Sequence, residues 1–402
     1  MENRSGAATQ PQEVETLTAR PRLTIGLPRC TVPGERRFPL TPDAVRSLTE
    51  RGYQVKIEEG APRSICYTDE AYARAGAVIT DRGRALECDM VIHLAPLGMA
   101  DIRRLRRGSM LFTLANFHRP QAADVIRQLL DRHIINIAID LITDRDGNRP
   151  FADVLSEIAG RAAIVLAAGM MADTARGKGI LPGGVAGVIP CEVLVLGSDL
   201  GACAAARSAI GLGATVQMFD GDVYRLRRAL RDLYGTVTGS SIHPHALENA
   251  LRRADVVIST DLEDCPVKVD ADGVELMKRG VLVFDLSCDP GHVFPSLPTV
   301  DVAVPDSRQC CGAPLSGADA PARRVCYVNA GSAVPRTAAM ALSDTFITLL
   351  DDIAGCEGRQ KAIMLTAGMQ EAVLTFLGKA VNRRVARMAG VKWTDIRLLM
   401  LS

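Results

Sequence analysis

Short apolar runs typical of buried strands alternate with helical patterns along almost the whole chain. Continuous apolar strands joined by helices are typical of a parallel sheet that is covered on both faces. In the first part of the chain, the strand-like runs lie at Leu23–Leu27, Gln54–Ile57, Met90–Leu94, Met110–Leu114 and Ile134–Ile139, and the helical segments include Thr41–Gly52 and Pro120–Arg132. This alternation predicts an α/β fold made of parallel βαβ units.

A second series of the same kind follows a loop rich in glycine and proline, Leu181–Pro190. Before that loop, the long apolar segment Glu157–Ala175 is predicted to be a helix that joins two domains. After Ala330 the pattern is helical to the end, and we expect these helices to pack back on the first domain. The second series has strands at Glu192–Leu196, Thr215–Phe219, Val256–Ser259 and Val281–Leu286, and helices at Ala202–Leu212, Val223–Leu233 and Asp270–Lys278.

Chain length, net charge and the distribution of apolar residues limit the classes of protein to which this chain can belong. A chain of 402 residues is too long for one ordinary core, and a net charge of +1 argues against nucleic acid or an anionic membrane as a partner. Residues 1–21 are polar and are expected to form a disordered tail rather than a signal peptide. We find no run of about 18 apolar residues, and we expect the apolar stretch Ala162–Ala172 to be a buried helix.

The 11 cysteines are scattered and form no Cys-x-x-Cys pair. This pattern is typical of reduced thiols and favours a cytoplasmic location. A metal site at Cys310, Cys311 and His292 is conceivable, but the spacing of structural zinc ligands is missing, so no metal is predicted.

A dinucleotide-binding turn is predicted where the strand Glu192–Leu196 meets Gly197-Ser-Asp-Leu-Gly-Ala202 and then a helix. This is the place of the G-x-G-x-x-G/A fingerprint. Gly197 would make the tight turn, Ser198 lies within it, and Ala202 would let the helix pack on the strand. Asp220 ends the next strand, where a carboxylate binds the ribose hydroxyls of NAD. Asp220 therefore favours NAD over NADP, although Arg225 and Arg227 nearby weaken that preference.

Asp199 stands where the fingerprint has its second glycine. The backbone approaches the pyrophosphate at that position, and a carboxylate there adds bulk and negative charge at a helix N-terminus that normally accepts a phosphate. Two interpretations stay open. Asp199 either turns aside and leaves the cofactor site usable, or it caps the helix in a Rossmann domain that has lost its dinucleotide.

The chain resembles the alanine dehydrogenases and the soluble α-subunit of proton-translocating transhydrogenase from about Arg22 to its C-terminal helices. The resemblance rests on these segments: Glu35-Arg-Arg-Phe-Pro-Leu-Thr-Pro42, Leu155-Ser-Glu-Ile-Ala-Gly-Arg161, Gly183-Gly-Val-Ala-Gly187, Gly211-Leu-Gly-Ala214, Phe284-Asp-Leu-Ser-Cys-Asp-Pro-Gly291 and Asn329-Ala-Gly-Ser-Ala-Val-Pro-Arg-Thr337. It implies two Rossmann-like doubly wound parallel-sheet domains, with an NAD domain (152–334) inserted in a substrate domain (22–151 plus 335–402). It also implies a homo-oligomer, a dimer or hexamer, that binds a small-molecule substrate.

The resemblance implies a role for individual residues as well. Arg37 matches the arginine that grips the substrate carboxylate, and Asp289 matches an aspartate near the nicotinamide. Ser156 and Asn329 fall where the family contacts the cofactor, although both could be ordinary loop caps.

Two departures from the family concern its catalytic groups. The family lysine corresponds to Leu94 and the family histidine to Asn116, and neither replacement can take up a proton at neutral pH. His93 and His118 are near the lost groups, and of these we prefer His118 as the residue that moves the proton, since it lies in a predicted loop.

The leading hypothesis is therefore an NAD(P)-dependent oxidoreductase acting on an amino or imino acid other than alanine. One alternative is a relative that has lost redox chemistry and serves as a ligand-binding or scaffold subunit, or as a non-redox enzyme. Another is a transhydrogenase-like soluble subunit, which would need a separate membrane partner.

Overall fold

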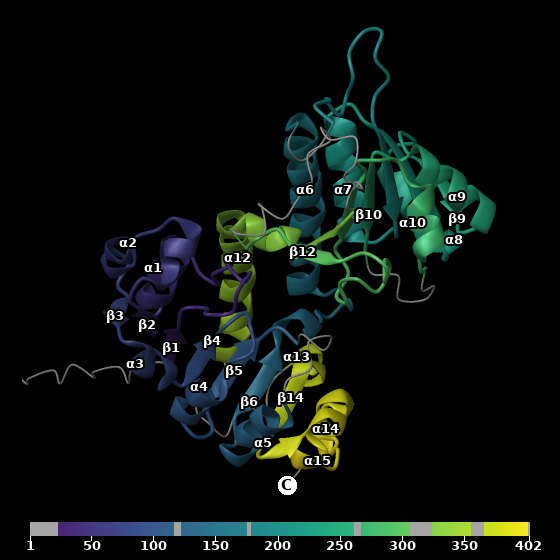
Figure 1. Ribbon diagram of the computed structural model, residues 1–402. Helices are drawn as coiled ribbons and strands as arrows, with labels where there is room; N and C mark the ends of the chain where they lie inside the picture. The colour runs from purple at the N-terminus through teal and green to yellow at the C-terminus, as the bar shows by residue number, and fades with distance from the viewer. Residues whose placement is uncertain are drawn as a thin grey trace, which may run out of the picture.

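Two α/β domains, each built on one sheet with helices on both faces, make up the computed structural model (Figure 1). The structure describes residues 23–115, 122–174, 178–260, 267–304, 324–354 and 366–400. The fold class expected from the alternating pattern is confirmed, and the second sheet is inserted in the sequence between two parts of the first.

The first sheet has the strand order β15-β14-β6-β5-β4-β1-β2-β3. Its strands are β1 (Thr24–Leu27), β2 (Gln54–Glu58), β3 (Val78–Thr80), β4 (Met90–Ile92), β5 (Met110–Thr113), β6 (Ile135–Ala138), β14 (Val373–Phe376) and β15 (Lys379–Ala380). From β3 to β6 all neighbours are parallel, and the direction of winding reverses between β1 and β4. Around this sheet lie α1 (Pro42–Glu50), η1 (Ala61–Ile65), α2 (Asp69–Arg74), α3 (Arg82–Leu86), α4 (Met99–Arg104), α5 (Ala123–Asp131), η2 (Ile139–Leu141), α12 (Pro335–Ala354), α13 (Ala367–Ala372), α14 (Arg383–Ala389) and α15 (Ile396–Met400).

The second sheet is entirely parallel and has the order β12-β13-β11-β10-β7-β8-β9. Winding reverses between β7 and β10, as in the doubly wound dinucleotide-binding fold. Its strands are β7 (Glu192–Leu196), β8 (Thr215–Asp220), β9 (Thr238–Ser241), β10 (Val256–Ser259), β11 (Leu282–Asp285), β12 (Thr299–Asp301) and β13 (Cys326–Val328), and its helices are α7 (Leu200–Gly211), α8 (Val223–Asp232), α9 (Pro244–Arg253), α10 (Ala271–Leu276) and η3 (Ala330–Ala333).

Alternate residues of β7 supply the two apolar cores of the second domain. Val193 and Val195 belong to one buried cluster, and Leu194 and Leu196 belong to the other. Side chains of a strand point alternately to opposite faces, so a strand that is apolar at every position must be covered on both sides.

The expectation that the chain is purely helical after Ala330 is wrong. β14 pairs antiparallel with β6, and β15 pairs antiparallel with β14. The C-terminal segment does return to the first domain, where it extends the sheet beyond β6 (yellow in Figure 1). Sheet strands of the first domain thus come from both ends of the chain, while the exact boundaries at 151/152 and 334/335 stay a prediction.

The helix α6 (Pro150–Ala172) runs between the domains and is longer than expected (Figure 1). It contains an 18-residue window of mean hydropathy 1.6, so the expectation that no such window exists is wrong. By length and composition α6 is the one described helix that could span a membrane, although 44% of that window is buried within the protein. A Cβ atom on Gly160 would lie 2.1 Å from the carbonyl oxygen of Gly201, so α6 and α7 cross in very close contact.

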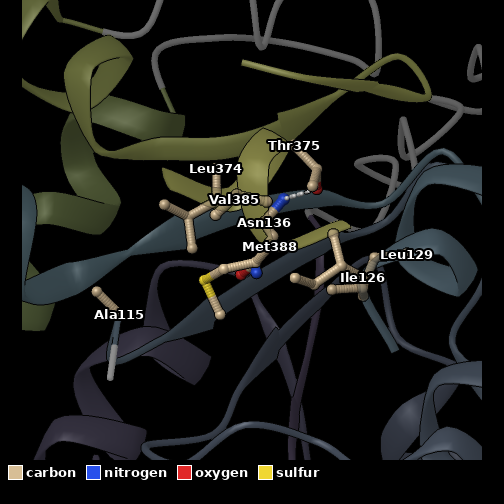
Figure 2. A pocket seen from close by; sticks show the side chains of 8 residues that line it. All are labelled: Ala115, Ile126, Leu129, Asn136, Leu374, Thr375, Val385 and Met388. Carbon is tan, nitrogen blue, oxygen red and sulfur yellow. Dashed lines mark hydrogen bonds between the residues drawn. The ribbon is translucent and has the colours of Figure 1, made fainter. Parts of the chain in front are cut away.

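A small cavity beside β6 holds one buried amide among apolar neighbours. Figure 2 shows the Asn136 side chain near Leu374 and Met388. The Asn136 Oδ1 atom has no hydrogen-bond partner in the described part of the chain. The lining carries one amide and one hydroxyl and no charged group, so we regard the cavity as a packing defect. It is lined by Ala115, Ile126, Leu129, Asn136, Leu374, Thr375, Val385 and Met388.

Candidate functional site

The turn after β7 lies where the winding of the second sheet reverses, which is where doubly wound folds bind ligands. Gly197 has φ of +116°, a backbone conformation that residues with a Cβ rarely adopt. Its N–H donates to the Phe219 carbonyl at 2.8 Å, which fixes the turn against β8. Gly197 therefore makes the tight turn that the sequence predicted.

Asp199 is the N-cap of α7. Its Oδ1 atom accepts a hydrogen bond of 2.7 Å from the backbone N–H of Ala202. A capping carboxylate stabilises the first turn of a helix. It also occupies one of the N–H groups that a phosphate would otherwise use, so this cap opposes an anion at the same place.

Ser156 lies beside this turn although it comes from α6. A Cβ on Gly201 would be only 2.5 Å from Ser156 Oγ and 3.5 Å from Asp199 Oδ1. The structure therefore brings Ser156 together with Asp199 and Ala202, and this grouping depends on the glycines that let the two helices touch.

Asp220 ends β8 and is 2% exposed. Its Oδ2 accepts from the Ser198 hydroxyl at 2.5 Å, and its Oδ1 accepts from the Asp222 N–H at 2.8 Å. Arg225 Nη2 is 3.9 Å from Oδ2. The Asp220 carboxylate is therefore already bound by Ser198 and lies near the positive charge of Arg225. A ribose hydroxyl at this strand end would bind the same carboxylate.

Asn329 links the second domain to the loop that carries Arg37. It has a left-handed backbone (φ +63°), and its Nδ2 donates to the Gly34 carbonyl at 2.8 Å. The same amide donates to Asp301 Oδ1 at 3.2 Å and Oδ2 at 3.1 Å. The Asn329 amide therefore connects Asp301 of the second domain to Gly34 of the first.

Arg37 is bound by Glu35, two residues earlier. Arg37 Nε donates to Glu35 Oε1 at 2.8 Å, and Nη2 donates to Oε2 at 2.5 Å. Burial lowers the pKa of Arg37. The negative charge of Glu35 and its hydrogen bonds together have the larger effect, so the pKa of the guanidinium is raised above its usual value. Ser332 from η3 also donates to Glu35 Oε1 at 3.4 Å. The predicted carboxylate-binding arginine is present, but its positive charge is already neutralised.

Asp140 is a carboxylate near Arg37 that is not among the predicted site residues. It follows β6, and its Oδ1 accepts from the Ala115 N–H at 2.8 Å. Burial raises the pKa of Asp140, while the Ala115 bond and the charges of Arg37 and Arg149 partly oppose this. The available signal was a carboxylate directly after an apolar strand, at the sheet edge where parallel strands place functional groups.

Leu94 and His93, which the sequence placed at and beside the expected lysine position, lie in the core. Leu94 is 2% exposed and belongs to the main apolar cluster of the first domain. His93 is 3% exposed, its Nδ1 is bonded to the Ala95 carbonyl, and burial lowers its pKa. Asn116 and His118, the other candidates for this chemistry, lie outside the described residues.

Asp289 lies on an exposed loop after β11. Its carbonyl accepts from Ser287 Oγ and from the His292 N–H, both at 3.1 Å. The buried carboxylate of that loop is Asp285, which binds Ser259 Oγ at 3.0 Å and the Gly291 N–H at 2.8 Å. Asp285 thus shapes the loop that presents Asp289.

No three potential ligands from His, Cys, Asp and Glu gather as a metal site within the described ranges. Cys310 and Cys311 lie outside those ranges, so their conceivable site with His292 is not described. The described cysteines are free thiols, at positions Cys30, Cys66, Cys88, Cys191, Cys203, Cys288 and Cys326.

These features define a two-domain protein of the doubly wound dinucleotide-binding class. Family profiles match both parts: "Alanine dehydrogenase/PNT, N-terminal domain" over residues 26–162 and "Alanine dehydrogenase/PNT, C-terminal domain" over residues 163–383. The chain belongs to the alanine dehydrogenase/PNT family.

Comparison with individual proteins agrees with this assignment. An alanine dehydrogenase of Mycobacterium tuberculosis (strain ATCC 25618 / H37Rv) is 30% identical over 383 residues, which cover 93% of this chain and 98% of the relative. A solved L-alanine dehydrogenase is 25% identical, with a TM-score of 0.77 over 91% of this chain and 99% of the other. A transhydrogenase from Sinorhizobium meliloti shares the fold, with a TM-score of 0.70 and 17% identity over 90% of this chain and 99% of the other.

Proposed function

We propose that the protein is an NAD(P)-dependent oxidoreductase that acts on an amino or imino acid other than alanine. The observation that carries this proposal is the strand–turn–helix at β7 and α7, with Gly197 in the turn and Asp220 at the end of β8. Its arrangement matches the pyrophosphate and ribose positions of the doubly wound fold. The nicotinamide of a bound cofactor would supply a hydride acceptor or donor.

The residues at the turn fit a dinucleotide only in part. Gly197 provides the turn, and Ala202 and Ser156 lie beside it. Asp199 opposes the pyrophosphate, since like charges about 4 Å apart repel by roughly 4 kcal/mol at an effective dielectric near 20. We therefore propose that nucleotide binds more weakly than it would with glycine at position 199.

Asp220 favours NAD, because a carboxylate repels the 2′-phosphate of NADP. Arg225 reduces this discrimination since its guanidinium is 3.9 Å from the Asp220 carboxylate. We propose a preference for NAD that is smaller than an isolated carboxylate would give.

In the substrate domain, Arg37 would hold the carboxylate of the amino or imino acid in place of Glu35, which binds the Arg37 guanidinium in this structure. A guanidinium offers a planar fork that matches a carboxylate. Because Leu94 cannot polarise a carbonyl, efficient turnover of alanine by the family's usual groups is not expected. Alanine turnover comparable with that of other alanine dehydrogenases would contradict this part of the proposal.

The test is thermal unfolding of the full chain with NAD⁺, NADH, NADP⁺ or no nucleotide. A ligand at 100 times its dissociation constant stabilises the fold by about 2.7 kcal/mol, which appears as a rise in Tm. We expect a rise with NAD⁺ or NADH in the wild type and a larger rise in Asp199→Gly. Asp270→Gly is the matched control, because Asp270 caps α10 of the same domain by accepting from Gly273 N–H at 2.9 Å.

The control should show the same nucleotide response as the wild type. No response in either the wild type or Asp199→Gly would overturn the proposal. The Asp199 cap favours a second candidate, a relative that has lost redox chemistry and serves as a ligand-binding or scaffold subunit, or as a non-redox enzyme. A response in Asp199→Gly alone would support that second candidate. Homo-oligomerisation and a cytoplasmic location stay predictions.

A further inference from the structure

Proton transfer in the substrate domain needs a titratable group, and the positions that carry one in the family do not supply it here. Leu94 has no ionisable atom and is packed in the core. His93 has its Nδ1 bonded to the Ala95 carbonyl and is 3% exposed, so its ring cannot reach a ligand in solvent. Three titratable groups near Arg37 affect its pKa: Glu35, Cys30 and Asp140.

Two of these three groups are unsuited to exchange a proton near neutral pH. Glu35 is committed to Arg37 through both carboxyl oxygens. Burial raises the pKa of Cys30 to about 11, so its thiol stays protonated. Asp140 differs because its bond to the Ala115 N–H engages only Oδ1, and the residue as a whole is partly rather than fully buried.

We propose that Asp140 holds and transfers the proton of the substrate nitrogen, beside the carboxylate held by Arg37. This inference rests on the proposed function, and it names the residue that replaces the lost lysine and histidine. Asp140 stands at the carboxyl end of β6, where Thr113 of β5 pairs with Ala138 of β6. The loop of Arg37 follows β1, and the carboxyl ends of β1 and β6 lie at the same edge of the sheet because β1, β4, β5 and β6 are parallel neighbours.

The proton balance is simple. In the direction from amino acid to imino acid, an N–H bond of the substrate ammonium breaks and an O–H bond forms on Asp140. The electron pair left on nitrogen would then form the C=N bond as Cα loses a hydride, for which a bound oxidised nicotinamide would supply the acceptor. In the reverse direction Asp140 returns the proton to nitrogen.

The surroundings of Asp140 suit this task. Burial raises its pKa, and the positive charges of Arg37, from the loop after β1, and Arg149, at the start of α6, oppose the rise. A substrate carboxylate on Arg37 offsets one of these positive charges. Binding an anion should therefore raise the pKa of Asp140 further and draw a proton from solution.

Calorimetry of the full chain measures that proton directly. Glyoxylate, the simplest α-keto acid, is titrated at pH 6 with NAD⁺ present, in two buffers that differ in ionisation enthalpy. We expect net proton uptake by the wild type and by Asp140→Glu, and binding without uptake by Asp140→Asn. Asp144→Asn is the control, because Asp144 is a nearby exposed carboxylate that binds Asn148; it should keep the uptake.

Activity provides a second measurement once a substrate is known. General acid–base groups contribute about 100- to 10,000-fold, so Asp140→Asn should lose that much in kcat, and the acid limb of the kcat/KM pH profile should disappear. Unchanged proton uptake in Asp140→Asn would overturn the inference while leaving the nucleotide-dependent rise in Tm intact. If the wild type binds no glyoxylate, the role of Arg37 and this inference fail together, whereas loss of the nucleotide response would contradict the cofactor site alone.

Discussion

Glu35 holds Arg37 by two parallel hydrogen bonds, of 2.8 Å and 2.5 Å, in a pair whose side chains are 10% and 14% exposed. The carboxylate of Glu35 thus occupies the fork that a substrate carboxylate would need. Ser332 of η3 contacts the same carboxylate, and Asn329 binds the preceding Gly34 carbonyl. The orientation of Arg37 is therefore linked to the second domain.

Replacement of Arg37 tests how much the Glu35–Arg37 pair contributes to the free energy of unfolding. Arg37→Met leaves the Glu35 carboxylate buried without its cation, and breaking a buried pair in this way costs about 3–5 kcal/mol. We expect the free energy of unfolding in urea to fall by about 3 kcal/mol, since the pair keeps some exposure. The double variant Glu35→Gln/Arg37→Met should lose clearly less than the sum of the single variants. Additive losses would show that the two side chains do not stabilise each other.

The crossing of α6 and α7 predicts opposite effects for two glycines of one helix. In Gly160→Ala the new Cβ would lie 2.1 Å from the Gly201 carbonyl oxygen, so the helices must separate, at a cost of about 1–3 kcal/mol. A Cβ added at Gly169 of α6 would meet no atom within 4 Å, so Gly169→Ala should stabilise by up to about 1 kcal/mol through helix propensity. Urea unfolding of both variants tests the contact, and equal effects would contradict it.

Strand positions were predictable where the sequence is apolar at every position. β7 and β10 begin and end at the residues expected, because a buried parallel strand needs no polar face. β14 was missed since Val373–Phe376 follows a helical segment and is only 4 residues long. Its strand conformation depends on pairing with β6, far earlier in the chain, a contact that no local pattern encodes.

The sequence predicted where the residues of the candidate site lie in the fold better than it predicted which of them bind one another. The turn at Gly197 follows from the strand and the fingerprint, and a capping role for Asp199 was one of two interpretations left open. The pairing of Glu35 with Arg37 was not predicted, because it requires a loop conformation that turns residues two apart toward each other. The exposed position of Asp289 likewise depends on how Asp285 organises its loop.

The cavity beside β6 predicts a stabilising substitution. Asn136 is 2% exposed and its Oδ1 has no partner within the described residues, and an unsatisfied buried polar atom costs about 1–3 kcal/mol. Asn136→Leu replaces the amide with an apolar group of similar size and should raise the free energy of unfolding by about 1 kcal/mol. Thr375→Val is the control and should lower the free energy of unfolding, because the Thr375 hydroxyl donates to the Ile134 carbonyl at 2.8 Å and this bond would be lost. Destabilisation by both variants would mean that the Asn136 amide is satisfied.

His93 predicts a dependence of stability on pH. Burial lowers the pKa of His93 in the folded protein, while the unfolded chain has a pKa of about 6.5. The unfolded state then binds more protons than the folded state, so the contribution of His93 is fully present above about pH 6.5 and is lost as the pH falls below it. Each unit of pH below that point should cost up to about 1.4 kcal/mol until the folded pKa is reached. We would measure the free energy of unfolding in urea between about pH 7.5 and 5, and we expect it to fall less steeply with pH in His93→Gln than in the wild type. His133→Gln is the control, because His133 is partly exposed just after α5, and it should follow the wild type. Parallel declines in the wild type and His93→Gln would assign the acid sensitivity to other groups.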